Sequence, residues 1–289
     1  METLKNIAAT LASGLRLIQA NFKATLLVLF VLWLIIPSDE EGLNSNNLEK
    51  ITLMGPILDA TSIVEQIDEA RKNKNIKGVL FSIDSPGGAV APSVEIAYAI
   101  KRLRETKPTV VYAAGIMASG GYYSAIWGSE IIANPGSMIG SIGVIMEGAD
   151  ISELMQKVGV KTQVVHAGTY KQVGTFDRPW SNVERAELDK VIKGTYNLFV
   201  HDVSRARKLD INKSTDYADA HIFTANQAIK VGLVDKIGVE FDAKKRVEVL
   251  AKIKDPVWNK EDPMDKFFKR FAAEGATLAH TYFPPITLK

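Results

Sequence analysis

GVLFSIDSPGG, residues 78–88, is a β-rich apolar run that ends in a serine, a proline and two glycines. It predicts a buried strand over 78–83, because a short apolar run bounded by turn residues is typical of one. Helix-like segments lie on both sides of it, at 63–72 and at 94–105, and Ser93 is a candidate cap for the second. Strand-like and helix-like runs alternate in this way along the chain. The alternation predicts an α/β domain with a largely parallel sheet covered by helices.

The other expected elements continue the same pattern. We expect further strands at 51–53, 109–113, 130–134 and 162–167. We expect further helices from about Ser119, near 151–158, and from Asn182 to about Arg207.

The composition is that of a globular protein. The 289 residues are 46% hydrophobic and 24% charged, and 35 Lys and Arg against 33 Asp and Glu leave a net charge of +2. A net charge so close to zero does not indicate a basic surface for nucleic-acid binding. The absence of cysteine excludes disulfides, thiolate metal sites and a thiol nucleophile. The four histidines share no metal-ligand spacing, so we expect neither a metal ion nor another cofactor.

Residues 24–36, ATLLVLFVLWLII, are uncharged and almost wholly apolar. The run is short for a membrane span, and a cleaved signal peptide and a buried core helix are the alternatives. No A-x-A cleavage site follows and apolar residues cover every face, so we expect an uncleaved transmembrane anchor. Basic residues precede the run and acidic ones follow it, which places residues 1–23 in the cytoplasm. We expect a linker at 37–48, the main domain at 49–245 outside the cytoplasm and a helical tail at 246–289.

Three glycine-bearing turns each follow an expected strand, at 84–88, 118–121 and 137–144. In an open parallel sheet, ligands bind at the carboxyl ends of the strands, so the three turns together indicate a site. Ser119 lies in the second turn at the expected start of a helix, where N–H groups favour an anion. Ser119 is therefore a candidate nucleophile. The alternative is that it only caps the helix.

A serine nucleophile needs a base and an oxyanion hole. The N–H groups of Gly88 and Gly120 are candidate donors to a tetrahedral intermediate. No histidine is a convincing base, and a lysine serves as one only when burial without a carboxylate partner keeps it neutral. Lys171, 52 residues after Ser119, has uncharged neighbours. That setting permits a neutral lysine without showing one, because most lysines in such a loop are solvated.

The motifs together resemble the signal peptide peptidase A (protease IV) family of bacterial Ser/Lys peptidases, in its short single-module form. The resemblance covers about residues 49 to 245. Family members often have an arginine or a glycine where this chain has Ala220. The likeness rests on SIDSPGG (82–88), MASGGYY (117–123), NPGSMIGSIGVIM (134–146), GTYKQVGTFDRPWS (168–181) and AHIFTANQAIKVGLVDKIG (220–238).

The resemblance implies a ClpP/crotonase-like fold of repeated ββα units, and hydrolysis of signal peptides and other apolar membrane-derived peptides. It implies that Ser119 is the nucleophile, that Lys171 is the general base, and that Gly88 and Gly120 form the oxyanion hole. The residues that it implies for substrate binding are Gly87, Ser141, Ile142, Gly143 and Val144, with Ser141 a weaker candidate for assisting the lysine.

The resemblance also bears on location and assembly. With the apolar run at 24–36 and its charged flanks, we expect a single-pass protein of the bacterial inner membrane, with the catalytic domain in the periplasm or extracytoplasmic space. Short forms assemble into homo-oligomeric rings, and the resemblance suggests that neighbouring protomers complete each site. Whether Ser119 meets the lysine of its own chain or of its neighbour stays open at this point.

Two other functions are alternatives. The first is a catalytically silent oligomeric membrane scaffold, against which the presence of both Ser119 and Lys171 argues. The second is a crotonase-type acyl-CoA enzyme, which rests on fold analogy alone. The membrane anchor and the Ser/Lys pair argue against it.

Overall fold

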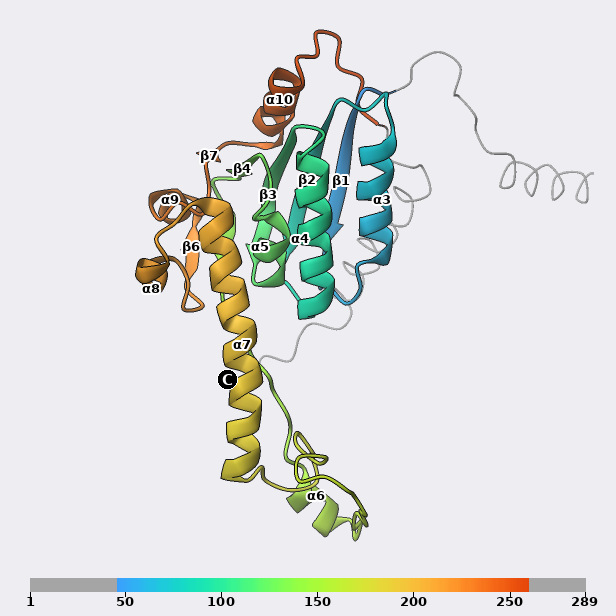
Figure 1. Ribbon diagram of the computed structural model, residues 1–289, viewed down its shortest axis with the longest axis vertical. Helices are drawn as coiled ribbons and strands as arrows, with labels where there is room; N and C mark the ends of the chain where they lie inside the picture. The colour runs from blue at the N-terminus through green and yellow to red at the C-terminus, as the bar shows by residue number, and fades with distance from the viewer. Residues whose placement is uncertain (1–45, 260–289) are drawn as a thin grey trace, which may run out of the picture. The chain divides into compact units, whose positions relative to one another are not determined.

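The computed structural model describes residues 46–259, and their centre is a seven-stranded sheet (Figure 1). Five strands pair in parallel. In addition, β5 (Met138–Gly140) pairs in parallel with the last residues of β3 (Thr109–Ala118), and β6 (Ile222–Thr224) runs antiparallel to β5. This arrangement confirms the predicted α/β class and the largely parallel sheet. The parallel strands, in spatial order, are β1 (Leu48–Met54), β2 (Gly78–Ser85), β3 (Thr109–Ala118), β4 (Glu130–Ala133) and β7 (Lys236–Ile237), and the other two are β5 (Met138–Gly140) and β6 (Ile222–Thr224).

Helices cover both faces of the sheet. In β2 successive side chains point to opposite faces, so Phe81 packs in the larger core and Leu80 in the smaller one. Because both faces are covered, β2 is apolar without alternation, which is why residues 78–83 were recognisable as a strand. The larger core lies under α3 (Thr61–Lys72), α4 (Val90–Arg104), α5 (Gly120–Ala125), the C-terminal part of α7 (Asn182–Arg207), α8 (Ser214–Tyr217) and α9 (Ala225–Lys230), whereas α10 (Glu240–Ala251) covers the other face.

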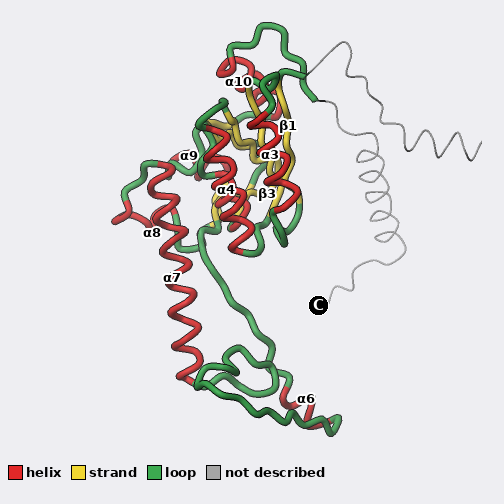
Figure 2. The backbone as a smooth tube through the Cα atoms, turned by 45° about the vertical axis from the view of Figure 1, so that its right-hand side comes forward, coloured by secondary structure: helices red, strands yellow, loops and turns green. Residues whose placement is uncertain are grey.

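An arm, residues 145–194, leaves the sheet after β5 and returns along α7 (Asn182–Arg207). Figures 1 and 2 show its short helix α6 (Ser152–Lys157) and the adjoining loops at the end of α7 that lies far from the sheet. Within the arm, Glu184 is the one buried residue. It closes a capping box with Ser181 at the start of α7, which is why the predicted helix begins at the predicted residue.

Three details differ from the expectations. The predicted strand at 162–167 is wrong, because this part of the arm has no neighbouring strand to satisfy its backbone groups. Ser93 does not cap a helix: α4 already begins at Val90, and the Ser93 hydroxyl donates back to Ala89 O at 2.8 Å. α10 runs through residue 245, where the main domain was expected to end, and packs against the sheet.

The expected segments at 1–23 and 24–36, and most of the linker and of the tail, lie outside the described residues. Between residues 46 and 259, no helix is both long enough and apolar enough to cross a membrane.

Candidate active site

Ser119 occupies a strained turn between β3 and α5. Its φ is 50° and its ψ is −125°, a backbone conformation that costs a non-glycine residue about 1–3 kcal/mol. Two hydrogen bonds hold the turn, from Ser119 N–H to Gly140 O at 2.8 Å and from Tyr123 N–H to Ser119 O at 2.9 Å. Although Ser119 stands at the N-cap position, its side chain makes no capping bond. Ser119 therefore does not cap α5, and its hydroxyl is available for chemistry.

Two polar side chains of β2 fix the neighbouring glycine turn. Asp84 accepts the N–H of Ile116 at 2.8 Å, at the point where the pairing of β2 with β3 shifts register. The Ser85 hydroxyl donates to Gly55 O at 2.6 Å and accepts the N–H of Gly87 at 3.2 Å. The Asp84 bond holds the end of β2 against β3, at whose end Ser119 lies, and the Ser85 bonds tie the glycine turn to the residue that follows β1.

Gly87, Gly88 and Gly120 bring two backbone N–H groups together beside Ser119. A Cβ on Gly87, whose φ is +97°, would lie 2.6 Å from Gly120 N and 2.8 Å from Ser119 Cβ, so this approach requires glycine. A Cβ on Gly120 would lie 3.3 Å from Gly88 N. Within residues 46–259, neither the Gly88 nor the Gly120 N–H donates a hydrogen bond. The pair is placed as the donors of an oxyanion hole would be.

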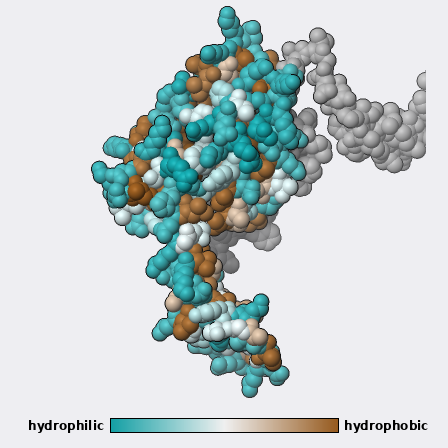
Figure 3. Space-filling view, in the orientation of Figure 1, coloured by the Kyte–Doolittle hydropathy of each residue, from teal (hydrophilic) through white to brown (hydrophobic). Residues whose placement is uncertain are grey.

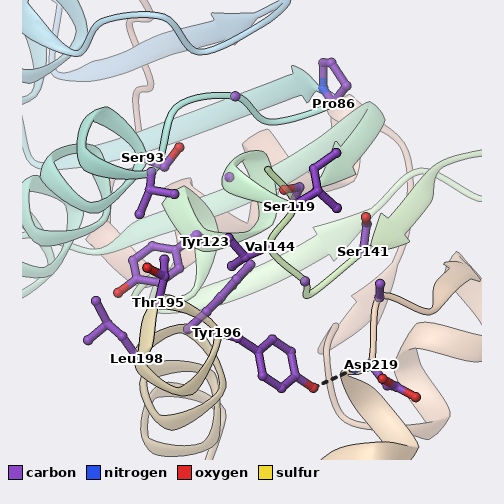
Figure 4. Close-up of a pocket in the computed structure, with 17 residues that line it drawn as sticks. Pro86, Ser93, Ser119, Tyr123, Ser141, Val144, Thr195, Tyr196, Leu198 and Asp219 are labelled. Atoms are coloured by element: carbon purple, nitrogen blue, oxygen red, sulfur yellow. Dashed lines mark hydrogen bonds between the residues drawn. The ribbon is translucent and has the colours of Figure 1, made fainter. Parts of the chain in front are cut away.

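A cavity of about 520 Å³ opens over these groups (Figure 4). Of the residues predicted to bind substrate, Ser141, Gly143 and Val144 line it, whereas Gly87 does not and Ile142 is fully buried in the larger core. The remaining wall was not foreseen from the sequence and is mostly apolar, comprising Pro86, Val90, Ser93, Tyr123, Ile145, Thr195, Tyr196, Leu198, Phe199, Asp219 and Ala220.

Lys171 does not line this cavity. It lies exposed in the arm, where its backbone N–H donates to Gly168 O at 3.2 Å. The surrounding loop is held by bonds within the arm, such as Ile151 N–H to Phe176 O at 2.9 Å. Within one chain, the structure thus brings Ser119 and both oxyanion donors together but does not bring Lys171 to them.

A buried hydrogen bond joins the helix after Ser119 to α7. The Tyr123 hydroxyl donates to Asp202 Oδ2 at 2.5 Å, and the Asp202 side chain is only 1% exposed. Burial, and next this hydrogen bond, raise the pKa of Tyr123 well above its usual range, so the phenol remains a neutral donor. Tyr123 also packs on Phe199, with ring centroids 4.7 Å apart. Tyr123 was visible in the MASGGYY motif, but nothing in the sequence marked Asp202, 79 residues away, as its partner.

Two protein-family models match the chain. The model of the Clp protease family matches residues 44–139, which include the first two glycine turns, and it confirms the ClpP-like part of the expected fold. The model of peptidase family S49 matches residues 101–254, more than half of the chain.

Individual relatives agree with the second match. A candidate protease of Methanocaldococcus jannaschii is 39% identical over 198 residues, which are 68% of this chain and 64% of that protein. A candidate protease of Synechocystis is 41% identical over 180 residues, 62% of this chain and 65% of that protein. A candidate signal peptide peptidase of Enterococcus faecium is 31% identical over 218 residues, 71% of this chain and 63% of that protein.

The chain thus spans just under two thirds of the length of each of these relatives. The S49 model covers Ser119, Lys171 and every cavity residue from Tyr123 to Ala220. Since that model matches more than half of the chain, the protein is a member of peptidase family S49.

Proposed function

We propose that this protein is a membrane-anchored serine endopeptidase that degrades signal peptides and other apolar membrane-derived peptides. The observation that carries the proposal is the Ser119 hydroxyl, which makes no capping bond, beside the N–H groups of Gly88 and Gly120, which donate to no residue of the described part of the chain. A nucleophile with two donors aimed at a developing oxyanion is what acyl transfer requires. Membership of a serine peptidase family supports the same reaction.

The proposed reaction has two halves. Ser119 Oγ attacks the scissile carbonyl carbon while neutral Lys171 takes the hydroxyl proton, and the carbonyl oxygen accepts hydrogen bonds from Gly88 and Gly120. The tetrahedral intermediate collapses to an acyl-enzyme as the C–N bond breaks, and the leaving amine takes the proton from the lysine. A water activated by the same lysine then attacks the ester, which releases the acid and restores Ser119.

The position of Lys171 decides how the dyad is assembled in this proposal. Because Lys171 lies in the arm and not in the cavity of its own chain, we propose that it serves the Ser119 of a neighbouring protomer in a homo-oligomeric ring. Exposed apolar side chains on the arm support this arrangement, since a soluble surface rarely leaves so many uncovered. Figure 3 shows hydrophobic patches on the arm, which carries exposed Ile145, Met146, Leu154, Val158, Val160, Val164, Val165 and Phe176.

The membrane part of the proposal rests on residues 24–36. Their apolar run would hold the chain in the bacterial inner membrane, with the cavity on the extracytoplasmic side. A peptidase held there would meet signal peptides as they leave the membrane. The largely apolar wall formed by Val90, Leu198 and Phe199 suits apolar peptides.

Covalent labelling tests the nucleophile and the base separately. The full-length protein should be labelled by a fluorophosphonate, and the Ser119→Ala variant should not be. Lys171→Ala should lose labelling and peptide turnover, whereas Lys161→Ala, an exposed lysine on the same arm, should keep both. Labelling of Ser119→Ala at the wild-type level, or full turnover by Lys171→Ala, would refute the dyad. An assembled wild-type protein that turns over no peptide would favour the scaffold.

Mixing the two inactive variants tests the assembly. If Lys171 of one protomer serves Ser119 of another, co-refolding or co-expressing Ser119→Ala with Lys171→Ala should restore part of the activity. Each mixed ring would then contain some sites with both residues intact. No recovery in verified mixed oligomers would place the dyad within one chain.

A further inference from the structure

Asp219 is the one charged side chain among the residues that line the described cavity. Its carboxylate is exposed and forms no ion pair with any residue between 46 and 259. Figure 4 shows Ser119, Ser141 and Asp219 following one another around the cavity, with Asp219 at the far end. Asp219 is therefore the one anionic residue on the wall of the described cavity.

The backbone around Asp219 is fixed from two sides. Residues 218–221 close a turn through a hydrogen bond, and φ is 57° at Asp219 and 58° at Ala220, as in a type I′ turn. The Asp219 N–H donates to the Tyr196 hydroxyl on α7 at 3.1 Å. The Ala220 N–H donates to Ile142 O at 3.0 Å, and the residues on either side of Ile142, Ser141 and Gly143, line the cavity. The carboxylate is thus presented by a defined turn.

We propose that Asp219 binds the cationic group of a basic residue in the peptide substrate. The inference rests on the proposed function and adds a charge preference to it. A lysine or arginine side chain suits the place because its methylene stem can lie on the Tyr196 ring and on Ala220 while its cationic end reaches the carboxylate. Favoured substrates are then apolar peptides with one basic residue at a fixed distance from the scissile bond.

The test measures kcat/KM of the full-length protein on a peptide series. One apolar peptide carries a single lysine, moved one position at a time on both sides of the scissile bond, and each peptide has a partner with norleucine instead. At one position, lysine should exceed norleucine by about three- to fivefold, which is the size of one partly exposed ion pair. The ratio should shrink when salt is added, since salt screens such a pair.

Two variants assign that preference to Asp219. Asp219→Asn should bring the ratio to about one, and asparagine tolerates the left-handed backbone, so the turn should persist. Asp216→Asn makes the same charge change at an exposed residue of α8 outside the cavity, and it should leave the ratio unchanged. Free and acetylated amino termini distinguish a basic side chain from a terminal ammonium group: a preference that vanishes on acetylation would overturn the assignment to a side chain.

Other outcomes would contradict either the role of Asp219 or the proposed function. Two results would show that Asp219 does not bind the substrate cation. One is a lysine-to-norleucine ratio of kcat/KM near one at every peptide position, and the other is an equal fall in kcat/KM for both peptides in Asp219→Asn. Absence of turnover and of Ser119 labelling in the wild type would contradict the proposed function instead. In that case, equilibrium binding of the lysine and norleucine peptides, measured by fluorescence anisotropy, still decides whether Asp219 binds the cation.

Discussion

The Tyr123 hydroxyl is expected to contribute measurably to stability because its partner is a buried carboxylate. Tyr123→Phe removes the donor at 2.5 Å from Asp202 and adds no new group. The carboxylate is then left with the Tyr98 hydroxyl at 3.5 Å and with Arg205 at 3.7 Å, whose own side chain is mostly exposed. Neither contact replaces a short hydrogen bond to a side chain that is 1% exposed.

The size of the loss follows from these contacts. A hydrogen bond to a charged group is worth about 1.5–3 kcal/mol, and the Tyr98 and Arg205 contacts retain part of it. We therefore expect Tyr123→Phe to lower the free energy of unfolding by about 2 kcal/mol. For a domain of about 200 residues, that corresponds to a fall of about 4–8 °C in the melting temperature.

Thermal unfolding of the full-length variants checks this value. Tyr123→Phe should show the full loss in the wild-type background but less than about 1 kcal/mol in an Asp202→Asn background, because the charge to be satisfied is gone. Phe199→Leu, which alters the packing on the Tyr123 ring and leaves the hydrogen bond in place, should not change that difference. A Tyr123→Phe variant within about 0.5 kcal/mol of the wild type, or an equal loss in both backgrounds, would refute the reasoning.

Two further predictions concern the arm and the turn. The Arg178 side chain, and next the N–H of Ser181, lower the pKa of Glu184 from 4.5 to about 2. The hydrogen bonds of Glu184 with Arg178 and Ser181 at the start of α7 should therefore be intact above pH 4.5 and weaken as the pH falls toward 2. Hydrogen-exchange protection in the first turn of α7, measured as the ratio of the intrinsic exchange rate at each pH to the observed rate, should fall over that range and depend less on pH in Arg178→Gln; constant protection in the wild type would contradict this. Ala220→Gly should raise the free energy of unfolding in urea by about 0.5–1 kcal/mol, because glycine adopts a φ of 58° without strain, and a lower value would show that the Ala220 methyl matters more.

The local elements were predictable where the physical cause is local. Residues 78–83 were identified as a strand because a buried parallel strand is apolar on both faces, and α7 was placed correctly because its cap and its apolar spacing lie within its own sequence. The strand expected at 162–167 failed for the opposite reason. A strand needs a neighbour, and apolar β-branched residues do not reveal whether one is present.

In the candidate active site, too, the features with a local cause were predictable and the features that depend on packing were not. Motifs within single turns identified Ser119, Gly88 and Gly120 as candidates, and the family resemblance added Lys171. That the two N–H groups meet beside an uncapped serine depends on the parallel pairing of β2 with β3, which places separate turns at one end of the sheet. Three features depend on residues far apart in the chain: the buried pair of Tyr123 with Asp202, the place of Asp219 on the cavity wall, and the separation of the arm from Ser119. Composition and residue spacing do not predict such contacts, because the contacts form only when the helices pack on the sheet.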